Sequence, residues 1–387
     1  MKRKIVILGS TGSIGKNTFN LVKKDKKNFE IKLLSTNKNI SEIIKQAKIF
    51  KVKNLIISDH SKYLLAKKKY KNLKINFHNS FSVIDKLFKK KEIFYSMMSL
   101  VGLDGLRPTL QLIRYSQNIG IVNKESLICG WTLIRKKLKK FKTIFIPVDS
   151  EHYSIFSLIE NNTTSIEKIY ITASGGPFLT RNKSKFSKIT VSDALKHPSW
   201  RMGKKISIDS STLMNKVFEV IEAKNIFDLD YDKISILTHP NSYVHAIVKF
   251  NNGLTKILVH EPDMKIPIHN TIHHSQKKKL HLKKLNFDIL NNLDFKKVDK
   301  QKFPLIKIID FLPQKNSLYE TALISINDYF VLKFLHNKIK FTQLIKFIYK
   351  YSNHRDFTKF KKNPVKNVND IYKIRNYVSL KLDTLGI

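Results

Sequence analysis

The chain has 387 residues, of which 42% are hydrophobic, and its 72 Lys and Arg against 30 Asp and Glu give a formal net charge of +42. Its length indicates two or three globular domains, and its lone cysteine, Cys129, excludes an internal disulfide and is typical of a reducing compartment such as the cytoplasm. The apolar run within residues 1–15 is too short for a secretory signal, and no stretch has the roughly eighteen apolar residues of a membrane span, so we expect no membrane partner.

The positive charge is the most unusual feature of the composition. An excess of this size is typical of proteins that bind nucleic acid or a membrane surface. Here the lysines are spread over the whole length and far outnumber the arginines, whereas a nucleic-acid groove concentrates basic residues on one element, with aromatic residues or arginines between them. We interpret most of the excess as compositional bias and predict no nucleic-acid partner; a basic nucleic-acid-binding protein is the first alternative.

The first predicted element is an apolar strand at 4–8, followed directly by the glycine loop GSTGSIG at 9–15 and an amphipathic helix. Strand, glycine loop and helix in this order are the context of a dinucleotide-binding turn, although the spacing G-x-x-G-x-x-G is a variant. Small residues let a pyrophosphate approach the N–H groups of a helix N-terminus, so we predict a Rossmann-like domain; a turn that binds nothing is the alternative. The residues that would meet the cofactor are Thr11, Gly12, Ser13 and Ile14.

The second predicted strand, 29–34, ends in a polar run that includes Asn37, Lys38 and Asn39. An NAD-specific site usually has an acid at this place, which bonds to the ribose 2′-hydroxyl. This run has no acid, and its hydroxyls, amides and lysine are able to accept a 2′-phosphate, which favours NADPH. The alternation of strands and helical segments then continues, as a doubly wound parallel sheet requires, with strands at 54–58, 93–98 and 119–122.

Polar residues follow the next two strand ends. Asn123, Lys124, Glu125 and Ser126 follow the strand 119–122, and Asp149, Ser150, Glu151 and His152 follow a strand at 143–148. Because residues two apart on an extended chain point the same way, Asp149 and Glu151 converge, and paired carboxylates suit Mg²⁺ or Mn²⁺ better than zinc. The alternative is a helix start with an N-cap and acids in its first turn. A metal site also needs a third carboxylate, for which Glu219 and Glu222 are the candidates.

A second polar region begins after a predicted strand at 168–172. The run SGGPF at 174–178 is able to cradle a phosphate, although a simple turn is the favoured interpretation of this run alone. Residues 197–211 have the composition of a loop, and a helix is predicted from Thr212, with Ser211 or Thr212 as its N-cap.

This predicted helix brings Asn215, Glu219 and Glu222 to one flank, because residues three and four apart are neighbours on a helix. Amides, hydroxyls and lysines at a helix start favour an anion site, and a nearby carboxylate favours a metal. A capped surface helix with a Lys216–Glu219 ion pair explains the same residues equally well.

The remaining chain is described by composition and periodicity. A strand is predicted at 234–237, and strands at 246–250 and 255–259 form a hairpin around Asn251-Asn252-Gly253. Residues 275–300 have little periodicity and are predicted to be a linker. Residues 303–350 are strongly helical, and 351–387 are basic with a weaker helical pattern.

Together these motifs resemble the 1-deoxy-D-xylulose 5-phosphate reductoisomerase family. The matching runs are GSTGSIG (9–15), NKES (123–126), PVDSEH (147–152), SGGPF (174–178), HPSWRMGKKISIDSSTLMNK (197–216), E-x-IEA (219–223), HPNSYVHA (239–246) and EPDMKIPI (261–268). They occur in the order expected for the family, and a chance match of all of them is not credible. Beyond residue 270 the resemblance is thin, and the run LISIND at 323–328 departs from the family's LNAANE-like pattern.

The resemblance implies an α/β protein with a helical C-terminal part and homodimers built through the central domain. The implied domains are an NADPH-binding Rossmann-like domain at 1–149, a catalytic domain with a flexible lid at 150–274, the linker at 275–300 and an α-helical domain at 301–387.

The resemblance also implies a role for each matching residue. Lys124, Asp149, Glu151 and Glu219 would be catalytic, and the last three would hold the metal. The substrate would meet Lys124, Ser150, Glu151, Ser174, His197, Ser210, Asn215, Lys216, Glu219 and Ser242. Asn123, Glu125 and Gly203 would join the cofactor residues at 11–14 and 37–39. Trp200 and Met202 would form the lid, with His245 and Met264 lining the site; taken singly, these four are as well explained by packing.

Members of the family rearrange and reduce 1-deoxy-D-xylulose 5-phosphate to 2-C-methyl-D-erythritol 4-phosphate in the non-mevalonate route to isoprenoids. The resemblance therefore implies NADPH and a divalent cation, Mg²⁺, Mn²⁺ or Co²⁺, as cofactors, and a small sugar phosphate as the substrate. A different NADP-dependent oxidoreductase, such as a relative of semialdehyde or homoserine dehydrogenases, is the second alternative. A semialdehyde dehydrogenase needs a catalytic cysteine, and Cys129, on a helical stretch after NKES, is poorly placed for that role.

Overall fold

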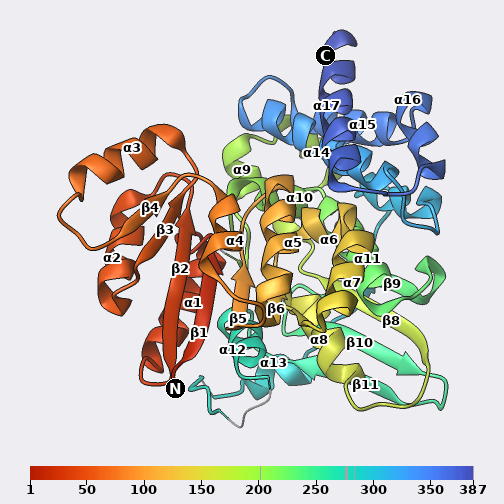
Figure 1. Ribbon diagram of the computed structural model, residues 1–387. Helices are drawn as coiled ribbons and strands as arrows, with labels where there is room; N and C mark the ends of the chain where they lie inside the picture. Colours follow the sequence, from red (N-terminus) through yellow and green to blue (C-terminus); the bar gives the residue numbers. More distant parts are fainter. Residues whose placement is uncertain (201, 275–277, 283, 387) are drawn as a thin grey trace. The chain divides into compact units, whose positions relative to one another are not determined.

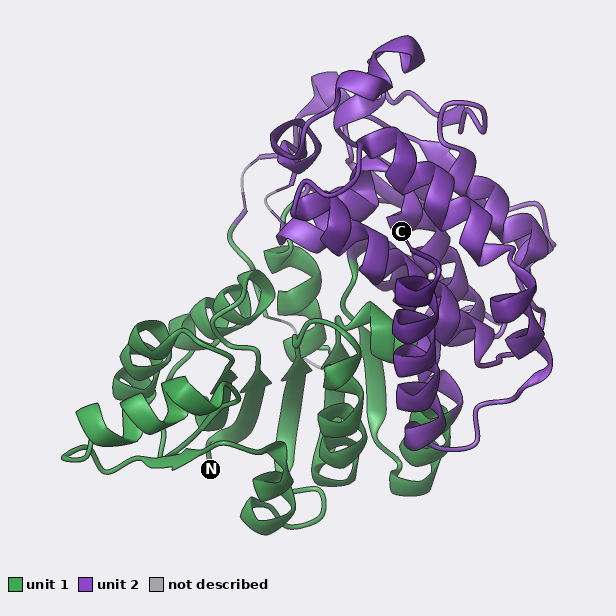
Figure 2. Cartoon of the chain, turned by 90° about the horizontal axis from the view of Figure 1, so that it is seen from above, with its two compact units in different colours: residues 1–127, 133–149, 263–281 green, residues 128–132, 150–262, 282–387 purple. Residues whose placement is uncertain are grey.

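The computed structural model describes residues 1–200, 202–274, 278–282 and 284–386. Its chain forms two compact units, coloured separately in Figure 2. The first contains residues 1–127, 133–149 and 263–281, and the second contains 128–132, 150–262 and 282–387. Arg201, which separates the two predicted lid residues, lies outside the described residues, as do 275–277 and 283 of the predicted linker.

The first unit is built on a parallel sheet of seven strands (Figure 1). The strands are β1 (Arg3–Leu8), β2 (Phe29–Thr36), β3 (Asn54–Ile57), β4 (Asn76–His78), β5 (Ile93–Met98), β6 (Ser116–Ile121) and β7 (Ile144–Pro147). Their order is β4-β3-β2-β1-β5-β6-β7, and neighbouring strands are parallel. The predicted doubly wound sheet is confirmed. The order reverses between β1 and β5, which is where such sheets bind their ligands.

Helices connect these strands and supply the rest of the first core. They are α1 (Ser13–Lys24), α2 (Ile40–Phe50), α3 (His60–Lys69), α4 (Ile84–Leu87), α5 (Leu106–Tyr115), α6 (Lys124–Cys129), α7 (Trp131–Phe141) and α12 (Lys265–Ile272), with short 3₁₀ turns η1 (Phe81–Val83) and η2 (Leu103–Gly105). Phe19 and Val22 on α1 pack with Ile5 and Phe29 of the sheet and with Ile268 of α12 in one buried cluster. The amphipathic pattern of α1 therefore fixes the glycine loop at its start against the sheet.

The second unit contains a mixed sheet of five strands. They are β8 (Ile166–Ala173), β9 (Ile234–Thr238), β10 (Val244–Phe250), β11 (Thr255–Val259) and β12 (Lys296–Lys297), in the order β11-β10-β8-β9-β12. Strands β8 and β9 are parallel, and the other pairs are antiparallel. The predicted hairpin is confirmed as β10–β11. Within the predicted linker, β12 pairs with β9, so this part of the linker is tied to the sheet.

Helices make up most of the second unit. They are α8 (Ser150–Ile159), α9 (Val191–Leu195), α10 (Lys204–Ser211), α11 (Met214–Phe227), α13 (Phe287–Asn291), α14 (Tyr319–Leu335), α15 (Phe341–Ser352), α16 (Arg355–Thr358) and α17 (Val368–Thr384). The 3₁₀ segments are η3 (Gly176–Phe178), η4 (Lys183–Lys188), η5 (Tyr231–Lys233), η6 (Pro304–Phe311) and η7 (Lys359–Lys362). The helical character predicted for 303–350 is confirmed.

The prediction of a loop through Ser211 is wrong, because residues 204–211 form α10. The start predicted for the next helix is also shifted. Leu213, with φ 59°, separates α10 from α11, and the Thr212 hydroxyl accepts a bond from the N–H of Met214. The surface-helix interpretation is wrong as well, since both Lys216 and Glu219 are buried. Tertiary packing on α11 and α14, which local composition does not reveal, makes α10 a helix.

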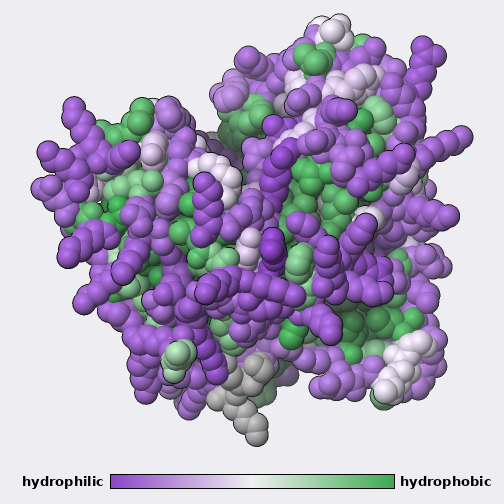
Figure 3. All heavy atoms as spheres, viewed as in Figure 1, coloured by the Kyte–Doolittle hydropathy of each residue, from purple (hydrophilic) through white to green (hydrophobic). Residues whose placement is uncertain are grey.

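Residues 263–274, which the sequence assigns to the catalytic domain, and 278–281 of the predicted linker pack in the first unit. The other domain limits stay predictions. Hydrophilic side chains cover most of the face in Figure 3, with hydrophobic residues scattered among them, as expected for lysines spread along the whole chain. Among the described residues, none of the helices is both long enough and apolar enough to cross a membrane.

Candidate active site

The glycine loop between β1 and α1 has the geometry of an anion-binding turn. Gly9 has φ +82°, and a Cβ there would lie 2.4 Å from the carbonyl oxygen of Ser99, so only glycine fits. Gly12 is the N-cap of α1 and leaves the helix without a side-chain cap or a first-turn acid. The N–H groups of the first turn are therefore not used by a capping side chain, which suits a phosphate.

The polar run after β2 lies next to this loop. The hydroxyls of Thr11 and Thr36 are 2.7 Å apart, and the Asn37 amide donates to the Ser58 hydroxyl. Asn39 caps α2, because its side-chain oxygen accepts from the N–H of Glu42. The structure therefore shows Asn39 as a helix cap, and its contact with a cofactor remains a prediction.

The NKES run positions a loop of the first unit. The Asn123 amide donates to the carbonyl oxygens of Leu100 and Gly102, at 2.7 and 2.8 Å, and its own oxygen accepts from the N–H of Ser126. Sequence reasoning did not predict this role for Asn123. Lys124 donates a hydrogen bond to Asp149, one of the three predicted metal ligands.

Three carboxylates come together at the start of α8. Oxygens of Asp149, Glu151 and Glu219 lie within 4.8 Å of one another. The helix begins at Ser150, so Asp149 directly precedes it and Glu151 lies in its first turn. The predicted convergence is correct, but its cause is the helix start that was the alternative interpretation, not an extended strand.

Lys216 neutralises part of this cluster. Its ammonium group donates to Glu151 and, over 2.6 Å, to Glu219, while the amide of Asn215 also donates to Glu219. Burial alone lowers the pKa of Lys216, but the charges of the two glutamates outweigh burial and raise it above its ordinary value. Lys216 is therefore charged, and its ammonium group faces both the partly buried Glu151 carboxylate and the buried Glu219 carboxylate.

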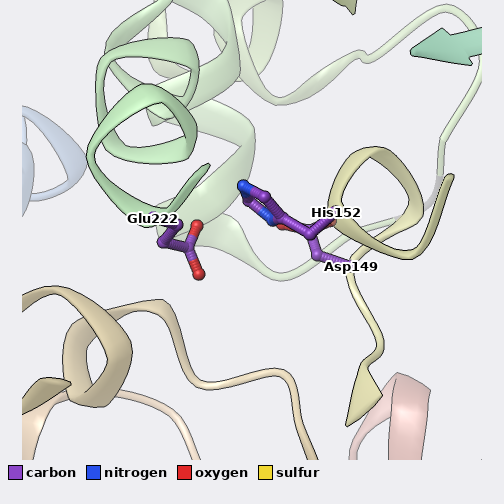
Figure 4. Close-up of side chains that lie close together, drawn as sticks. All are labelled: Asp149, His152 and Glu222. Carbon is purple, nitrogen blue, oxygen red and sulfur yellow. The ribbon is translucent and has the colours of Figure 1, made fainter. Parts of the chain in front are cut away.

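A second set of possible metal ligands lies on the same two helices. Asp149, His152 and Glu222 also offer atoms within 4.8 Å of one another, and Figure 4 shows the His152 ring directed toward Glu222. His152 donates through Nε2 to the carbonyl oxygen of Glu219, which leaves Nδ1 as the nitrogen with a lone pair in the neutral ring. The spacing of Glu222, one turn after Glu219, was the signal that kept it a candidate.

Ser174 and His197, two predicted substrate residues of the second unit, form a hydrogen-bonded pair. His197 Nδ1 accepts from the N–H groups of Ser199 and Trp200, so the neutral ring carries its proton on Nε2, which lies 3.1 Å from the Ser174 hydroxyl. Burial and the nearby charge of Lys216 lower the His197 pKa to about 4. At neutral pH His197 is therefore an uncharged hydrogen-bond donor.

Gly176 brings the SGGPF run close to α10. A Cβ on Gly176 would lie 2.7 Å from the carbonyl oxygen of Ser210, and its φ is +65°. The glycine therefore permits a close approach between Ser174 and Ser210, the two serines predicted to bind phosphate. A cavity of about 390 Å³ opens beside this run. It is lined by Ser174, Phe178, Arg181, Lys196, Pro198 and Pro240, among others.

The predicted lid residue Trp200 lies edge-on to His245, with ring centroids 6.2 Å apart. His245 is 2% exposed and stacks on His260 at 3.9 Å, so it is a buried histidine of β10. Gly203 is the N-cap of α10, and Ser242 is buried with φ 55°. Met264 instead packs partly against the core of the first unit.

The fold and these clusters define a class: an α/β protein with a dinucleotide-type glycine loop and a carboxylate cluster suited to a divalent metal. Three family models match the chain. The 1-deoxy-D-xylulose 5-phosphate reductoisomerase model covers residues 5–130, and two C-terminal-domain models of the same enzyme cover 145–227 and 259–378. The chain belongs to the 1-deoxy-D-xylulose 5-phosphate reductoisomerase family.

Individual relatives agree with this assignment. The 1-deoxy-D-xylulose 5-phosphate reductoisomerase of Pelagibacter ubique is 52% identical over 387 residues, which is all of both chains. A solved structure of the enzyme from Zymomonas mobilis with NADPH is 28% identical, covers 100% of this chain and 99% of its own, and has a TM-score of 0.89. A reductoisomerase structure with NADPH, fosmidomycin and magnesium is 27% identical, covers 99% of each chain and has a TM-score of 0.90.

These matches correct one expectation. The resemblance was taken to be thin beyond residue 270, but the family model at 259–378 and the full-length relative extend it through the C-terminal part. The C-terminal part contains no specific short motif, and its run at 323–328 departs from the family's pattern, so the sequence motifs alone did not reveal the resemblance there.

Proposed function

We propose that the chain converts 1-deoxy-D-xylulose 5-phosphate to 2-C-methyl-D-erythritol 4-phosphate with NADPH and a divalent cation. Family membership supports this function. The observation that carries it is the cluster of Asp149, Glu151 and Glu219, whose oxygens lie within 4.8 Å. Lys124 and Lys216 balance part of the negative charge of these three carboxylates, and a divalent cation would balance the rest.

The carboxylate cluster fits Mg²⁺, because hard oxygen donors are the ligands that this ion prefers. Asp149, Glu151 and Glu219 would hold the ion, and Mn²⁺ or Co²⁺ would suit the same donors. When bound, a divalent cation supplies Lewis-acid polarisation of the substrate's oxygens. Lys124, which donates to Asp149, would keep that carboxylate oriented and would lie near the substrate.

The phosphate of the substrate would bind among neutral and cationic donors of the second unit. Lys216 supplies the charge, and His197 donates from Nε2 as a neutral ring. The remaining proposed contacts are the hydroxyls of Ser174 and Ser210 and the amide of Asn215, with Ser150 and Ser242 on the substrate's own hydroxyls. Trp200 and Met202 would cover the bound substrate and exclude water.

NADPH would bind at the first unit and supply the hydride. Its pyrophosphate would approach the N–H groups at Thr11, Gly12, Ser13 and Ile14, where α1 has no side-chain cap. The 2′-phosphate would meet the run Asn37, Lys38 and Asn39, in which Lys38 is exposed. Asn123, Glu125 and Gly203 complete the proposed cofactor contacts.

We further propose a homodimer formed through the central domain and a cytoplasmic location. The family supports the dimer, and the single cysteine supports a reducing compartment. Cys129 is buried on α6. Its burial argues against a role as a catalytic nucleophile and therefore against the semialdehyde dehydrogenase alternative.

One assay tests the proposed function. Purified protein is mixed with NADPH and 1-deoxy-D-xylulose 5-phosphate, and the loss of NADPH absorbance is followed with Mg²⁺ or with a chelator. We expect oxidation that requires both the substrate and the cation and that fosmidomycin inhibits. No oxidation with any of Mg²⁺, Mn²⁺ or Co²⁺, in a protein that binds NADPH, would contradict the proposal.

A further inference from the structure

Helix α10 holds Ser210, one of the proposed phosphate contacts, and begins at Lys204, shortly after the predicted lid residues. It has only 8 residues. A helix this short has little stability of its own and depends on its packing partners. The elements that contact α10 therefore decide where Ser210 lies.

Helix α14, far along the chain, makes a buried polar contact with α10. The Asn327 amide donates to Asp209 Oδ1 over 2.8 Å. Asn327 is fully buried and Asp209 is 2% exposed. Hydrogen bonds to a buried carboxylate are strong and directional, so this contact fixes α10 in position and in rotation.

An ion pair lies beside the buried bond. Lys205 Nζ is 2.8 Å from Asp328 Oδ1 and 3.8 Å from Asp209 Oδ2, one turn along α10. The same ammonium lies 5.8 Å from the centre of the Phe218 ring on α11. Lys205 thus connects α10 to α14 and to the helix that holds Glu219.

The position of α10 also bears on the SGGPF run. Because a Cβ on Gly176 would lie 2.7 Å from the Ser210 carbonyl oxygen, the two backbones are in close contact. A shift of α10 toward this run would push it, and a shift away would open a gap behind Ser174. Both serines of the proposed phosphate site therefore depend on the same helix.

We propose that Asn327 and Asp328 are positioning residues for the phosphate site, acting through Asp209 and Lys205 on α10. They lie in the run at 323–328 that departs from the family's pattern. The inference rests on the proposed function and adds to it: the C-terminal helix sets the affinity for the substrate's phosphate. NADPH binding should depend on this contact much less, because Gly203 is the one proposed cofactor residue that adjoins α10.

A reciprocal exchange tests the hydrogen bond. Asn327→Asp alone places two carboxylates together, and we expect KM for 1-deoxy-D-xylulose 5-phosphate to rise about tenfold or more, with a smaller fall in kcat. Combining it with Asp209→Asn exchanges donor and acceptor, and we expect KM to return to within about threefold of the original value. The dissociation constant of NADPH should change much less than KM in both variants.

Two further variants keep the test decisive. Asp328→Asn removes the charge of a partly exposed side chain, so this variant should fold even if Asn327→Asp does not. For Asp328→Asn we expect a smaller rise in KM and weaker inhibition by fosmidomycin. Ser325→Ala is the control, because the Ser325 hydroxyl bonds within α14 to Thr321 and should change neither constant.

Several outcomes would overturn the inference. They are an unchanged KM in folded Asn327→Asp and Asp328→Asn, no recovery in the double variant, or an equal rise for Ser325→Ala. Failure of the proposed function is distinct, since the unaltered protein would then oxidise no NADPH with this substrate.

Discussion

Glu219 on α11 and Glu320 on α14 are both only 1% exposed, in the same unit, yet their surroundings differ. Glu219 lies 2.6 Å from the Lys216 ammonium. Glu320 instead accepts from the N–H and hydroxyl of Ser317. Burial raises the Glu320 pKa to about 7, because it outweighs these bonds and the charge of Lys224.

The difference shows that burial of a carboxylate does not by itself mark a metal site. Next to an ammonium, a buried carboxylate keeps the charge that a cation requires. Among hydroxyls, it takes up a proton near neutral pH instead. Glu219 is therefore suited to bind a metal, while Glu320 is suited to a helix interface.

The largest expected effect separates the two glutamates by activity. Glu219→Gln removes a proposed metal ligand, and we expect turnover with Mg²⁺ to fall about a thousandfold or more, while NADPH still binds. Glu320→Gln is the matched control and should keep most of the activity. Steady-state rates and NADPH titration measure both; full activity in Glu219→Gln would remove this residue from the metal site.

The second prediction concerns the charge balance of the cluster. Lys216→Met removes the ammonium shared by Glu151 and Glu219, and we expect a loss of about 3–5 kcal/mol in the free energy of unfolding. Because Mg²⁺ would supply the missing positive charge, it should raise Tm more in this variant than in the original protein. Thermal unfolding with and without Mg²⁺ measures the difference, and equal shifts would argue against a metal at these carboxylates.

The third prediction concerns the pH dependence of stability. With its folded pKa near 7 and an ordinary value of 4.5, Glu320 holds its proton in the folded state over a pH range in which the unfolded state has lost it. Its contribution to stability is therefore full below about pH 4.5 and declines as the pH rises through 7.

Glu320→Gln removes this titration while the amide oxygen still accepts from Ser317. Each pH unit between the two pKa values is worth about 1.4 kcal/mol, so the variant should gain about 3 kcal/mol relative to the original protein between pH 4.5 and 8. Urea unfolding at several pH values measures the two curves. Parallel curves would show that burial does not raise the Glu320 pKa above its value in the unfolded chain.

These two glutamates also show how far sequence reasoning reaches. Glu219 was a candidate because it belongs to a motif and lies at helical spacing from Asn215 and Lys216, which are local signals. Glu320 gave no signal, since its surroundings come from α14, α11 and η5 together. For the same reason α10 was missed: its run KKISIDSS has no apolar stripe, and its bond from Asn327 joins residues 118 apart in the chain.

The strands were easier to predict. Short apolar runs bounded by glycine or polar residues predicted the bounds of β1, β5 and β11 almost to the residue. This works because the pattern of a strand lies in its own consecutive residues. The convergence of Asp149 and Glu151 was also foreseen, although α8 rather than a strand produces it. Contacts within one element are thus predictable, and those that join distant helices are not.

The smallest expected effect concerns the hydroxyl of Tyr231, whose pKa is raised by burial and by the nearby Glu320. The Tyr231 hydroxyl is buried, and among residues 1–200, 202–274, 278–282 and 284–386 it has no hydrogen-bond partner. Removing a buried hydroxyl that makes no bond recovers its desolvation cost, so Tyr231→Phe should leave the protein as stable or more stable, by up to about 1 kcal/mol. Urea unfolding at pH 6 and pH 8 measures this change. A loss of more than about 1 kcal/mol in the free energy of unfolding at pH 8 would mean that the hydroxyl donates to the ionised Glu320 carboxylate. Glu320 would then, like Glu219, be ionised next to a donor that stabilises its charge.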